Sequence, residues 1–584
     1  MERYDVVIVG AGLAGLTLAR QLLLTAGDRR ILLLEKRAAI PPEGQKVGEA
    51  TVQVSGYYLS KVLDLEEHLL REHFLKYNLR FYWKSAKDPA SFENYSQSYI
   101  RQFSNIATYQ LDRNTLEGEL LRLNLEDARF TFRPGVSEIE ADVDVAPHRV
   151  TWNGGGAPAT AVCEWLVDTS GRGKLLARPR GLHLSGSIRH GTSFMWVEGL
   201  LNIEKLTALS ATAALRHPNR VATGHAPLWL ATNHFCGEGF WFWTIPLQGK
   251  TSLGLVFDNT LIPYDRVSSA RKLTEWVCAE FPLFARDLPH RRILHHGGYK
   301  DFAFDCAQTI SAERWAMSGE AGRFSDPLYS PGGDLISTYN TLIVDAILTE
   351  DASELSRKAA LYEQMMRAFY EGYVPGFAVS YNALGDQEAF TLKYTWELTI
   401  YFGFYVFPFI NGMFTDLRFA THFLRRFTEL GRANRAMQSF VSDFYRWKKA
   451  GGLEPGDVTF FDFMEIGALR EAERTFYQVG VSVDEAIREI DRQFANVQHL
   501  GRLIAAHVSS RVLGDRRVIW NRAFVEDISL PTLTFDPEEM RARHTRTAES
   551  TERYDWPFDP AVLDRFRPQT VGAGVGSQPR ENSR

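Results

Sequence analysis

The chain has 584 residues, of which 45% are hydrophobic and 23% charged, as is typical of a globular protein with a large core and more than one domain. Its formal net charge of −5 gives no basic field, which excludes nucleic acid as an expected partner and leaves membrane contact a minor alternative. Four widely spaced cysteines show neither a disulfide framework nor zinc spacing, so we expect reduced thiols, no metal site and a cytoplasmic location.

The N-terminal segment predicts a strand–helix–strand unit. Residues 4–9 (YDVVIV) are a β-branched run typical of a buried parallel strand, residues 13–24 have a helical pattern, and residues 31–34 predict the second strand. The apolar run starts at once, without a basic segment or a cleavage site, so no signal peptide is expected. This order predicts one βαβ unit of a parallel sheet.

The pattern Gly10-x-Gly12-x-x-Gly15 lies between the first predicted strand and the helix. Its context supports a dinucleotide-binding motif, because Glu35 follows it by about 20 residues at the end of the second strand. Gly10 permits a tight turn, Gly12 lets the backbone approach a pyrophosphate, and Gly15 lets helix and strand pack closely. We therefore predict a dinucleotide site in which Glu35 binds ribose hydroxyls, with further contacts from Leu13, Ala14 and Lys36.

Two later segments favour FAD over NAD as the dinucleotide. Residues 166–172 (LVDTSGR) and residues 315–327, which contain Gly319-Glu320, resemble the later FAD-contact motifs of the flavin monooxygenase superfamily. The usual pair there is Gly-Asp, and Glu320 keeps the charge but adds a methylene. Residues 109–113 (YQLDR) resemble a segment of the same superfamily, which implies Arg113 as an FAD contact. Locally, Asp112 is a predicted helix N-cap.

Three further stretches resemble the flavin-dependent halogenases, and the resemblance spans roughly residues 4–345. Residues 240–246 (FWFWTIP) contain the WxWxIP pattern, residues 48–51 (GEAT) resemble a GEST-type segment, and residues 326–334 (DPLYSPGGD) resemble a flavin and halide loop. The resemblance implies that Glu49, Ala50, Thr51, Pro327, Gly332 and Gly333 contact FAD, and that Trp241, Trp243, Tyr329 and Ser330 line the substrate site or a tunnel.

The two tryptophans are two residues apart on a predicted strand, so both rings lie on the same face. Rings between flavin and substrate would keep the substrate from reacting directly with an oxygenated flavin. Plain core packing is the alternative, because aromatic residues dominate cores.

In that family reduced flavin, oxygen and halide give hypohalous acid, which passes to the substrate through a tunnel containing an essential lysine. The resemblance implies Lys76 for this role, because it precedes an alternating aromatic strand. A lysine buried among aromatics would have a lowered pKa. The alternatives are an exposed lysine at a turn, and Lys84 or Lys46 as weaker candidates.

Tyr329 lies near the position where the tryptophan-specific halogenases carry a glutamate that assists proton removal, and a tyrosine is no general base at neutral pH. The resemblance is therefore closer to members acting on phenols, pyrroles or carrier-bound acyl groups. Gly332 and Gly333 suit a halide held by backbone N–H groups, whereas Asp334 would disfavour an anion if its side chain pointed inward.

We predict a flavin-dependent halogenase of secondary metabolism, such as antibiotic biosynthesis, that uses FADH2, O2 and chloride or bromide. The chain shows no second dinucleotide pattern, so a separate flavin reductase would supply reduced flavin. The substrate would be an electron-rich aromatic molecule, free or bound to an acyl or peptidyl carrier protein. The alternatives are an FAD-dependent monooxygenase that hydroxylates an aromatic or polyketide-like substrate, and a catalytically silent flavoprotein that binds a carrier protein.

The predicted fold is mixed α/β, with a Rossmann-like FAD-binding domain of the glutathione-reductase-like, aromatic-hydroxylase type. We expect this domain within residues 1–350, in pieces 1–84, 105–180 and 295–350, with a β-sheet substrate domain inserted at 181–294. A helix should start near Thr338. Residues 351–514 should be helical, including a buried aromatic wall or interaction surface at 398–414, and residues 515–584 should form an extended tail, disordered from about 568.

Overall fold

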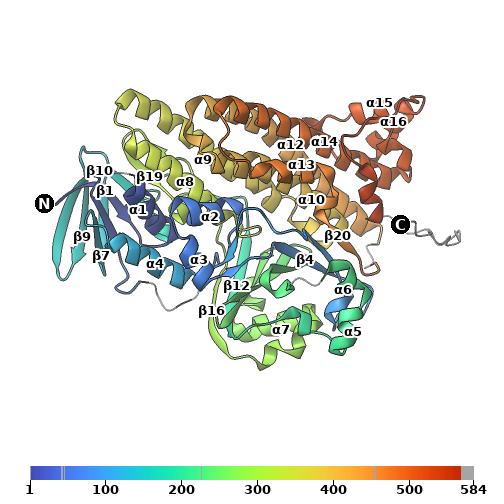
Figure 1. Cartoon of the computed structure of the whole chain (residues 1–584), viewed down its shortest axis with the longest axis horizontal. Coiled ribbons are helices and arrows are strands. Elements are labelled where there is room, and N and C mark those ends of the chain that lie inside the picture. The colour runs from blue at the N-terminus through green and yellow to red at the C-terminus, as the bar shows by residue number, and fades with distance from the viewer. Residues whose placement is uncertain are drawn as a thin grey trace, which may run out of the picture.

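Two eight-stranded sheets and a thick helical layer form the chain (Figure 1). The computed structural model describes residues 2–25, 27–40, 44, 46–224, 227–452 and 456–566. In Figure 1 the first sheet lies on the left, the second sheet lies below on the right, and the helices of the C-terminal half cover the top of both.

The first sheet contains the predicted dinucleotide unit. Its strands run in the order β18-β19-β10-β1-β2-β7, and β10 also pairs with the antiparallel strands β9 and β8. Strands β7, β2, β1, β10 and β19 are parallel neighbours. The bounds are β1 Glu2–Val9, β2 Ile31–Glu35, β7 Phe130–Pro134, β8 Ser137–Asp142, β9 His148–Gly154, β10 Ala157–Asp168, β18 Ile310–Ser311 and β19 Trp315–Met317.

Three helices pack together beside this sheet: α1 (Leu13–Thr25), α4 (Arg113–Leu125) and α8 (Pro331–Leu348). The predicted strand, helix and second strand of the N-terminal unit are confirmed. The predicted cap of α4 is also confirmed, because Asp112 accepts hydrogen bonds from the backbone N–H groups of Asn114 and Thr115. Helix α8, however, begins at Pro331 and not near Thr338; proline suits the first helical position, and the following glycines are tolerated in the first turn.

The second sheet carries the WxWxIP stretch on a central strand, and its order is β16-β12-β15-β14-β13-β4-β5-β20. Only four of these strands lie wholly within the expected insert 181–294. Strand β4 instead pairs in parallel with β13, far along the chain, and β20 joins from the helical region. Such long-range pairing leaves no local trace in a sequence. The bounds are β4 Leu79–Lys84, β5 Tyr95–Tyr99, β12 His190–Glu198, β13 Thr232–Gly237, β14 Phe240–Leu247, β15 Lys250–Asp258, β16 Ile293–Tyr299 and β20 Phe460–Asp462.

The helical layer is built around four long helices, α9 (Ala352–Ala378), α10 (Gln387–Ile400), α12 (Leu417–Ala450) and α14 (Val483–Leu513). Helix α10 continues into a π-helical turn, Tyr401–Val406, and then into α11 (Phe407–Ile410). The aromatic stretch 398–414 is thus a buried wall, as expected. Among the described residues, no helix has both the length and the apolar character needed to cross a bilayer.

The segment expected to be an extended tail contains two helices, α15 (Arg522–Glu526) and α16 (Pro537–Thr547). Asp536 caps α16 and Pro537 occupies its first position, which is a start signal that the sequence interpretation overlooked. The disorder expected from about residue 568 falls outside the described residues.

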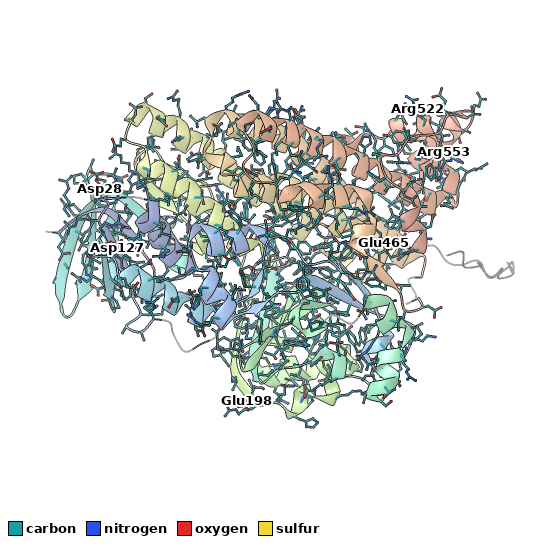
Figure 2. The ribbon with its side chains drawn as sticks, in the orientation of Figure 1. Asp28, Asp127, Glu198, Glu465, Arg522 and Arg553 are labelled. Carbon is teal, nitrogen blue, oxygen red and sulfur yellow. The ribbon has the colours of Figure 1, made fainter. Side chains whose placement is uncertain are left out.

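The shorter elements complete the chain. The strand pairs are β3 (Phe74–Leu75) with β6 (Tyr109–Gln110), and β11 (His183–Ser185) with β17 (Phe304–Cys306). The remaining helices are α2 (Gln53–Tyr57), which continues into a π-helical turn at Tyr58–Val62, α3 (Glu66–Glu72), α5 (Ala211–Arg216), α6 (Pro218–Thr223), α7 (Ala270–Glu280) and α13 (Gly467–Phe476). Figure 2 shows labelled charged residues, such as Asp28, Glu198 and Arg522, at the outer edges of the molecule.

Candidate functional site

A large cavity of about 430 Å³ is lined by segments of the first sheet, the second sheet and α8. We call it the large cavity. Nearly all the predicted cofactor contacts line it: Gly10, Gly12, Leu13, Ala14, Glu35, Lys36, Glu49, Ala50, Thr51, Arg113, Gly319, Glu320, Pro327, Gly332 and Gly333. Trp241, Trp243 and Ser330 line it too.

The three glycines of the N-terminal turn have different surroundings. Gly10 has a φ of +111°, and a Cβ there would lie 2.4 Å from the carbonyl oxygen of Thr169. A Cβ on Gly12 would meet no atom within 4 Å, so this residue faces open space at the cavity. A Cβ on Gly15 would lie 2.0 Å from the carbonyl oxygen of Gly10. Gly15, which was expected among the cofactor contacts, therefore does not line the cavity and serves the packing of helix on strand.

Glu35 ties the end of β2 to this turn. Its Oε2 accepts a 2.7 Å hydrogen bond from the backbone N–H of Ala11, and its Oε1 accepts a bond from the Arg37 guanidinium at 3.0 Å. Oε1 also accepts from the backbone N–H of Arg37 at 2.9 Å, whereas Oε2 has a further lone pair, so the buried side chain can still accept a ribose hydroxyl there. The open Cβ direction of Gly12, the N-terminus of α1 and Glu35 together fit the pyrophosphate and ribose of FAD.

Arg113 and Lys46 share the fully buried carboxylate of Glu117 at the cavity wall. Arg113 Nη2 donates to Glu117 Oε1 at 2.6 Å, and Lys46 pairs with the other carboxylate oxygen. Burial lowers the pKa of Lys46, and the Glu117 charge partly offsets this. Glu320 accepts a bond from Arg172 at 3.1 Å.

The two tryptophans of β14 face the large cavity with ring centroids 5.6 Å apart. The indole N–H of Trp243 donates to Ser252 Oγ at 3.1 Å, and Ser252 in turn donates to Glu49 Oε2 at 2.5 Å. Trp196 donates to the other oxygen of Glu49 at 2.6 Å. The GEAT glutamate, expected to contact FAD, thus also holds Trp243 in place.

Trp241 is held by a second chain of hydrogen bonds. Its indole N–H donates to Tyr381 Oη at 2.6 Å, and Tyr381 donates to Asp326 Oδ2 at 3.2 Å. His190 Nδ1 lies 2.6 Å from the same oxygen. Each indole is therefore connected by hydrogen bonds to a buried carboxylate, Trp243 to Glu49 of the GEAT segment and Trp241 to Asp326 of the loop 326–334. Tyr381 lies in the helical region, and no sequence pattern predicted that it would contact Trp241.

Lys76 is buried, with 4% of its surface exposed, and is not an exposed lysine at a turn. Its Nζ donates to the backbone carbonyl of Thr51 at 2.6 Å. Lys76 lines a second cavity of about 80 Å³, the small cavity, whereas Thr51 lines the large one. The ammonium group thus lies in the wall between the two cavities.

Burial lowers the pKa of Lys76 to about 7, and the Asp334 carboxylate partly opposes this shift. Asp334 Oδ1 accepts from the backbone N–H of Ser55 at 2.8 Å, and Oδ2 accepts from Tyr401 Oη at 2.6 Å. Burial raises the pKa of Asp334 to about 6 despite these bonds. The Asp334 carboxylate is therefore engaged with Ser55 and Tyr401.

The loop that precedes α8 has a strained backbone. Tyr329 and Ser330 have φ values of 68° and 61°, a left-handed conformation that costs non-glycine residues about 1–3 kcal/mol each. Strain of this kind clusters at functional sites. Ser330 lines the large cavity, and Tyr329, expected with it, lines the small cavity.

The rest of the small cavity comes mainly from the helical layer, including Tyr373 of α9, Glu397 of α10 and Tyr401 of the π-helical turn. The sequence interpretation missed these residues. The spacing of Tyr394, Glu397 and Tyr401, which matches one face of a helix, could have drawn attention to them. It also missed His234, which lines the large cavity and whose pKa burial lowers to about 3.

The other two lysines considered for the catalytic role lie elsewhere. Lys46 lines the large cavity and pairs with Glu117, and Lys84 is exposed and pairs with Glu280 at 2.5 Å. Neither of them lines the small cavity.

Comparisons with known proteins show what the chain is similar to. The family model described as Tryptophan halogenase matches residues 5–127. The flavin-dependent halogenase chlA of Dictyostelium discoideum is 23% identical over 461 residues, a match that covers 72% of this chain and 73% of chlA. The tetracycline 7-halogenase of Kitasatospora aureofaciens is 27% identical over 359 residues, covering 56% of this chain and 60% of that protein.

The fold agrees with these relatives. The crystal structure of the halogenase PltM in complex with phloroglucinol and FAD matches with a TM-score of 0.57 and 17% identity, covering 85% of this chain and 96% of PltM. The predicted mixed α/β fold with a Rossmann-like FAD-binding unit is therefore confirmed. Family model and relatives together show that this chain is similar to the flavin-dependent halogenases, and they support an FAD-dependent oxidoreductase.

Proposed function

We propose that this protein halogenates a small electron-rich aromatic substrate, with FADH2 from a separate flavin reductase, O2 and chloride or bromide as co-reactants. The flavin, when bound, supplies the activation of oxygen that oxidises the halide to hypohalous acid. The position of Lys76 is the observation that carries the proposal. Its ammonium group lies between a cavity that fits FAD and a second cavity that can take a substrate.

Lys76 is suited to hold and protonate an oxidant that moves between the cavities. A pKa of about 7 means that the side chain exchanges a proton readily at neutral pH, where general acid catalysis is most efficient. The hydrogen bond to the Thr51 carbonyl holds Nζ in place and uses one of the three N–H groups of the ammonium. The oxygen of hypohalous acid can accept one of them, and a proton can follow when the oxygen–halogen bond breaks.

The tryptophan pair favours halogen transfer over direct oxygen transfer. Trp241 and Trp243 are held by Tyr381 and Ser252, so their rings form a fixed part of the wall of the large cavity. A substrate in the small cavity would be kept apart from the flavin by protein, and only a small oxidant would pass. A hydroxylase instead needs its substrate next to the flavin.

The substrate class follows from the size and lining of the small cavity. About 80 Å³ is far below the roughly 300–1,000 Å³ of pockets that take drug-sized ligands, so a single-ring substrate is favoured. PltM, which shares the fold, binds phloroglucinol, a trihydroxylated benzene. Delivery of the ring by a carrier protein in the cytoplasm, as part of secondary metabolism, is a further part of the proposal.

The test supplies the protein with FAD, a flavin reductase, NADH, oxygen and bromide, and follows a phenol by mass spectrometry. We expect bromine to be added. The Lys76→Ala variant should retain FAD, seen by its absorbance, and lose turnover by at least about 100-fold, because it lacks the proton donor. Lys84→Ala is the matched control, since Lys84 is exposed and should leave turnover unchanged.

Each other outcome contradicts a part of the proposal. Oxygen added in place of bromine would identify a hydroxylase. A Lys76→Ala variant as active as the wild type would remove the lysine from the mechanism. FAD binding without halide oxidation in the wild type would favour a catalytically silent flavoprotein.

A further inference from the structure

The small cavity contains three polar atoms without a hydrogen-bond partner among the described residues. They are Tyr329 Oη, Tyr373 Oη and Glu397 Oε2. Native proteins satisfy most buried polar groups, because leaving one unpaired is costly. Tyr329 and the Glu397 carboxylate are close enough to interact with each other, and a polar ligand can complete the remaining hydrogen bonds of the three atoms.

The Glu397 carboxylate is held so that one oxygen stays available. Its Oε1 pairs with the ammonium group of Lys393, one helical turn earlier, and accepts from Gln438 Nε2 at 3.0 Å. The Lys393 side chain is fully buried, so its charge acts on the carboxylate with little screening by solvent. This arrangement orients the glutamate and leaves Oε2 to accept from Tyr329 or from a ligand in the cavity.

The two tyrosines of the cavity and the nearby Asp334, which does not line it, cannot fill the same role. Burial raises the pKa of Tyr329 and of Tyr373 well above the usual range, and for Tyr329 the charge of Glu397 and a hydrogen bond to it add to the shift, so both phenols stay protonated as donors. Both oxygens of Asp334 already accept hydrogen bonds, from Ser55 and from Tyr401. Glu397 is thus the acceptor, and the two tyrosines are donors.

We propose that Glu397 is a catalytic base that binds the hydroxyl group of a phenolic substrate and takes its proton during halogenation. The inference rests on the proposed function and specifies its substrate class. A single-ring phenol with a second oxygen substituent fits, because its hydroxyl group donates to Glu397 Oε2 and its other oxygen accepts from Tyr329 or Tyr373. In tryptophan-specific halogenases a glutamate near the position of Tyr329 assists proton removal. Here Glu397 of helix α10 would take that role.

The step balances with hypohalous acid as the oxidant, which the proposed function supplies. The ring carbon ortho or para to the hydroxyl forms a bond to the halogen, the oxygen–halogen bond breaks, and Lys76 protonates the departing oxygen to give water. Glu397 meanwhile takes the phenolic proton, which leaves a halogenated dienone. The ring carbon then loses its proton to the neutral Lys76, and Glu397 returns its proton to the oxygen. The products are the halophenol and water, and both residues are restored.

The test compares Glu397→Gln with the wild type on two probes in the presence of the reductase and bromide. Resorcinol reports substrate halogenation, and a cyclic 1,3-diketone traps free hypobromous acid. We expect a loss on the order of 100-fold or more with resorcinol, because the base is gone, and an unchanged rate with the trap. Glu371→Gln is the matched control on helix α9, because Glu371 is half exposed and should leave both rates unchanged.

A substrate of higher acidity separates a base from a structural residue. 4-Nitrophenol, which is ionised at mildly alkaline pH, needs no base, so the ratio of wild-type to variant rates should fall at least tenfold relative to resorcinol. An equal loss on both phenols, or no loss on resorcinol, would overturn the assignment. If the wild type brominated neither the phenols nor the trap, the proposed function itself would fail.

A double variant distinguishes loss of the base from misfolding caused by an unpaired buried charge. Glu397→Gln alone leaves the buried Lys393 ammonium without its partner, whereas Lys393→Met with Glu397→Gln removes both charges. The double variant should show the same loss with resorcinol and the same recovery with 4-nitrophenol. Recovery of resorcinol turnover in the double variant would contradict the role of Glu397 as the base.

Discussion

At the scale of the residue, two buried ionisable groups with opposed pKa shifts lie close to the proposed reaction site. Burial lowers the pKa of Lys76 to about 7 and raises that of Asp334 to about 6, and each charge opposes the shift of the other. Pairs whose environments move their pKa values toward neutrality are characteristic of functional sites. The carboxylate thus helps to keep the lysine protonated at neutral pH.

Asp334→Asn should move the alkaline limb of the pH–rate profile. Without the carboxylate the pKa of Lys76 falls below about 7, so the ammonium form is lost at a lower pH. The rate of bromination measured against pH should therefore decline earlier on the alkaline side. Asp345→Asn on the same helix is the control, because Asp345 pairs with Lys358 outside both cavities. An unchanged limb would show that Asp334 does not set the charge of the lysine.

At the scale of the element, the turn between β1 and α1 separates cofactor binding from helix packing. Gly12 faces open space, whereas Gly15 touches the backbone of Gly10. A side chain at Gly12 would therefore collide with the bound ligand, whereas a side chain at Gly15 would collide with the protein backbone.

Gly12→Val should abolish FAD binding while leaving the fold intact, because the added side chain would occupy the space of the pyrophosphate. Gly15→Ala should destabilise the protein by about 1–3 kcal/mol, because its Cβ would press on the Gly10 carbonyl. Flavin absorbance after gel filtration and thermal unfolding distinguish the two. Flavin retained by Gly12→Val would contradict the position of the pyrophosphate.

The sequence was informative where structure is local. The β1–α1–β2 unit and the Asp112 cap could be predicted because each depends on residues close in the chain. Tyr381 could not be predicted, because it reaches the site only through tertiary contacts, and the helical spacing of Glu397 with Tyr394 and Tyr401 indicates a shared face but not the cavity that this face lines. The same holds for β20, which joins the second sheet from a distance of more than three hundred residues.

At the scale of the whole molecule, the helical layer completes the site. It supplies Tyr381 to the Trp241 chain and most of the wall of the small cavity. A buried charge cluster joins α10 to α12 and α14, because Glu388 accepts from Lys448 at 2.8 Å and from His507 at 2.8 Å. This cluster fixes the helix that carries Glu397.

Glu388→Gln should destabilise the protein by about 3–5 kcal/mol, because it removes the buried carboxylate that pairs with Lys448 and Arg511, and among the described residues only Lys448 keeps a second partner, Asp386. Burial raises the pKa of Glu388, but the bond from His507 and the charge of Lys448 lower it overall to about 2. The carboxylate therefore adds stability above its unfolded pKa of about 4.5, and this stability is lost as the pH falls toward 2. Denaturant unfolding measured across this window should show a weaker pH dependence in the variant.

Glu354→Gln is the control for this measurement, because the Glu354 side chain on α9 is partly exposed and its partner Lys358 keeps Asp345 as a second carboxylate. Equal stability of Glu388→Gln and the wild type would mean that the cluster does not hold the layer in place.

The anchor of Lys76 is a main-chain carbonyl, and this has a consequence for inheritance. The Thr51 oxygen that holds the amine belongs to the path of the chain and to no particular side chain. A missense change at codon 51 alters the cavity surface but does not delete the acceptor. A lineage can therefore exchange this threonine for serine, which keeps the hydroxyl that accepts from the Tyr109 N–H, without displacing the amine on which its chemistry depends.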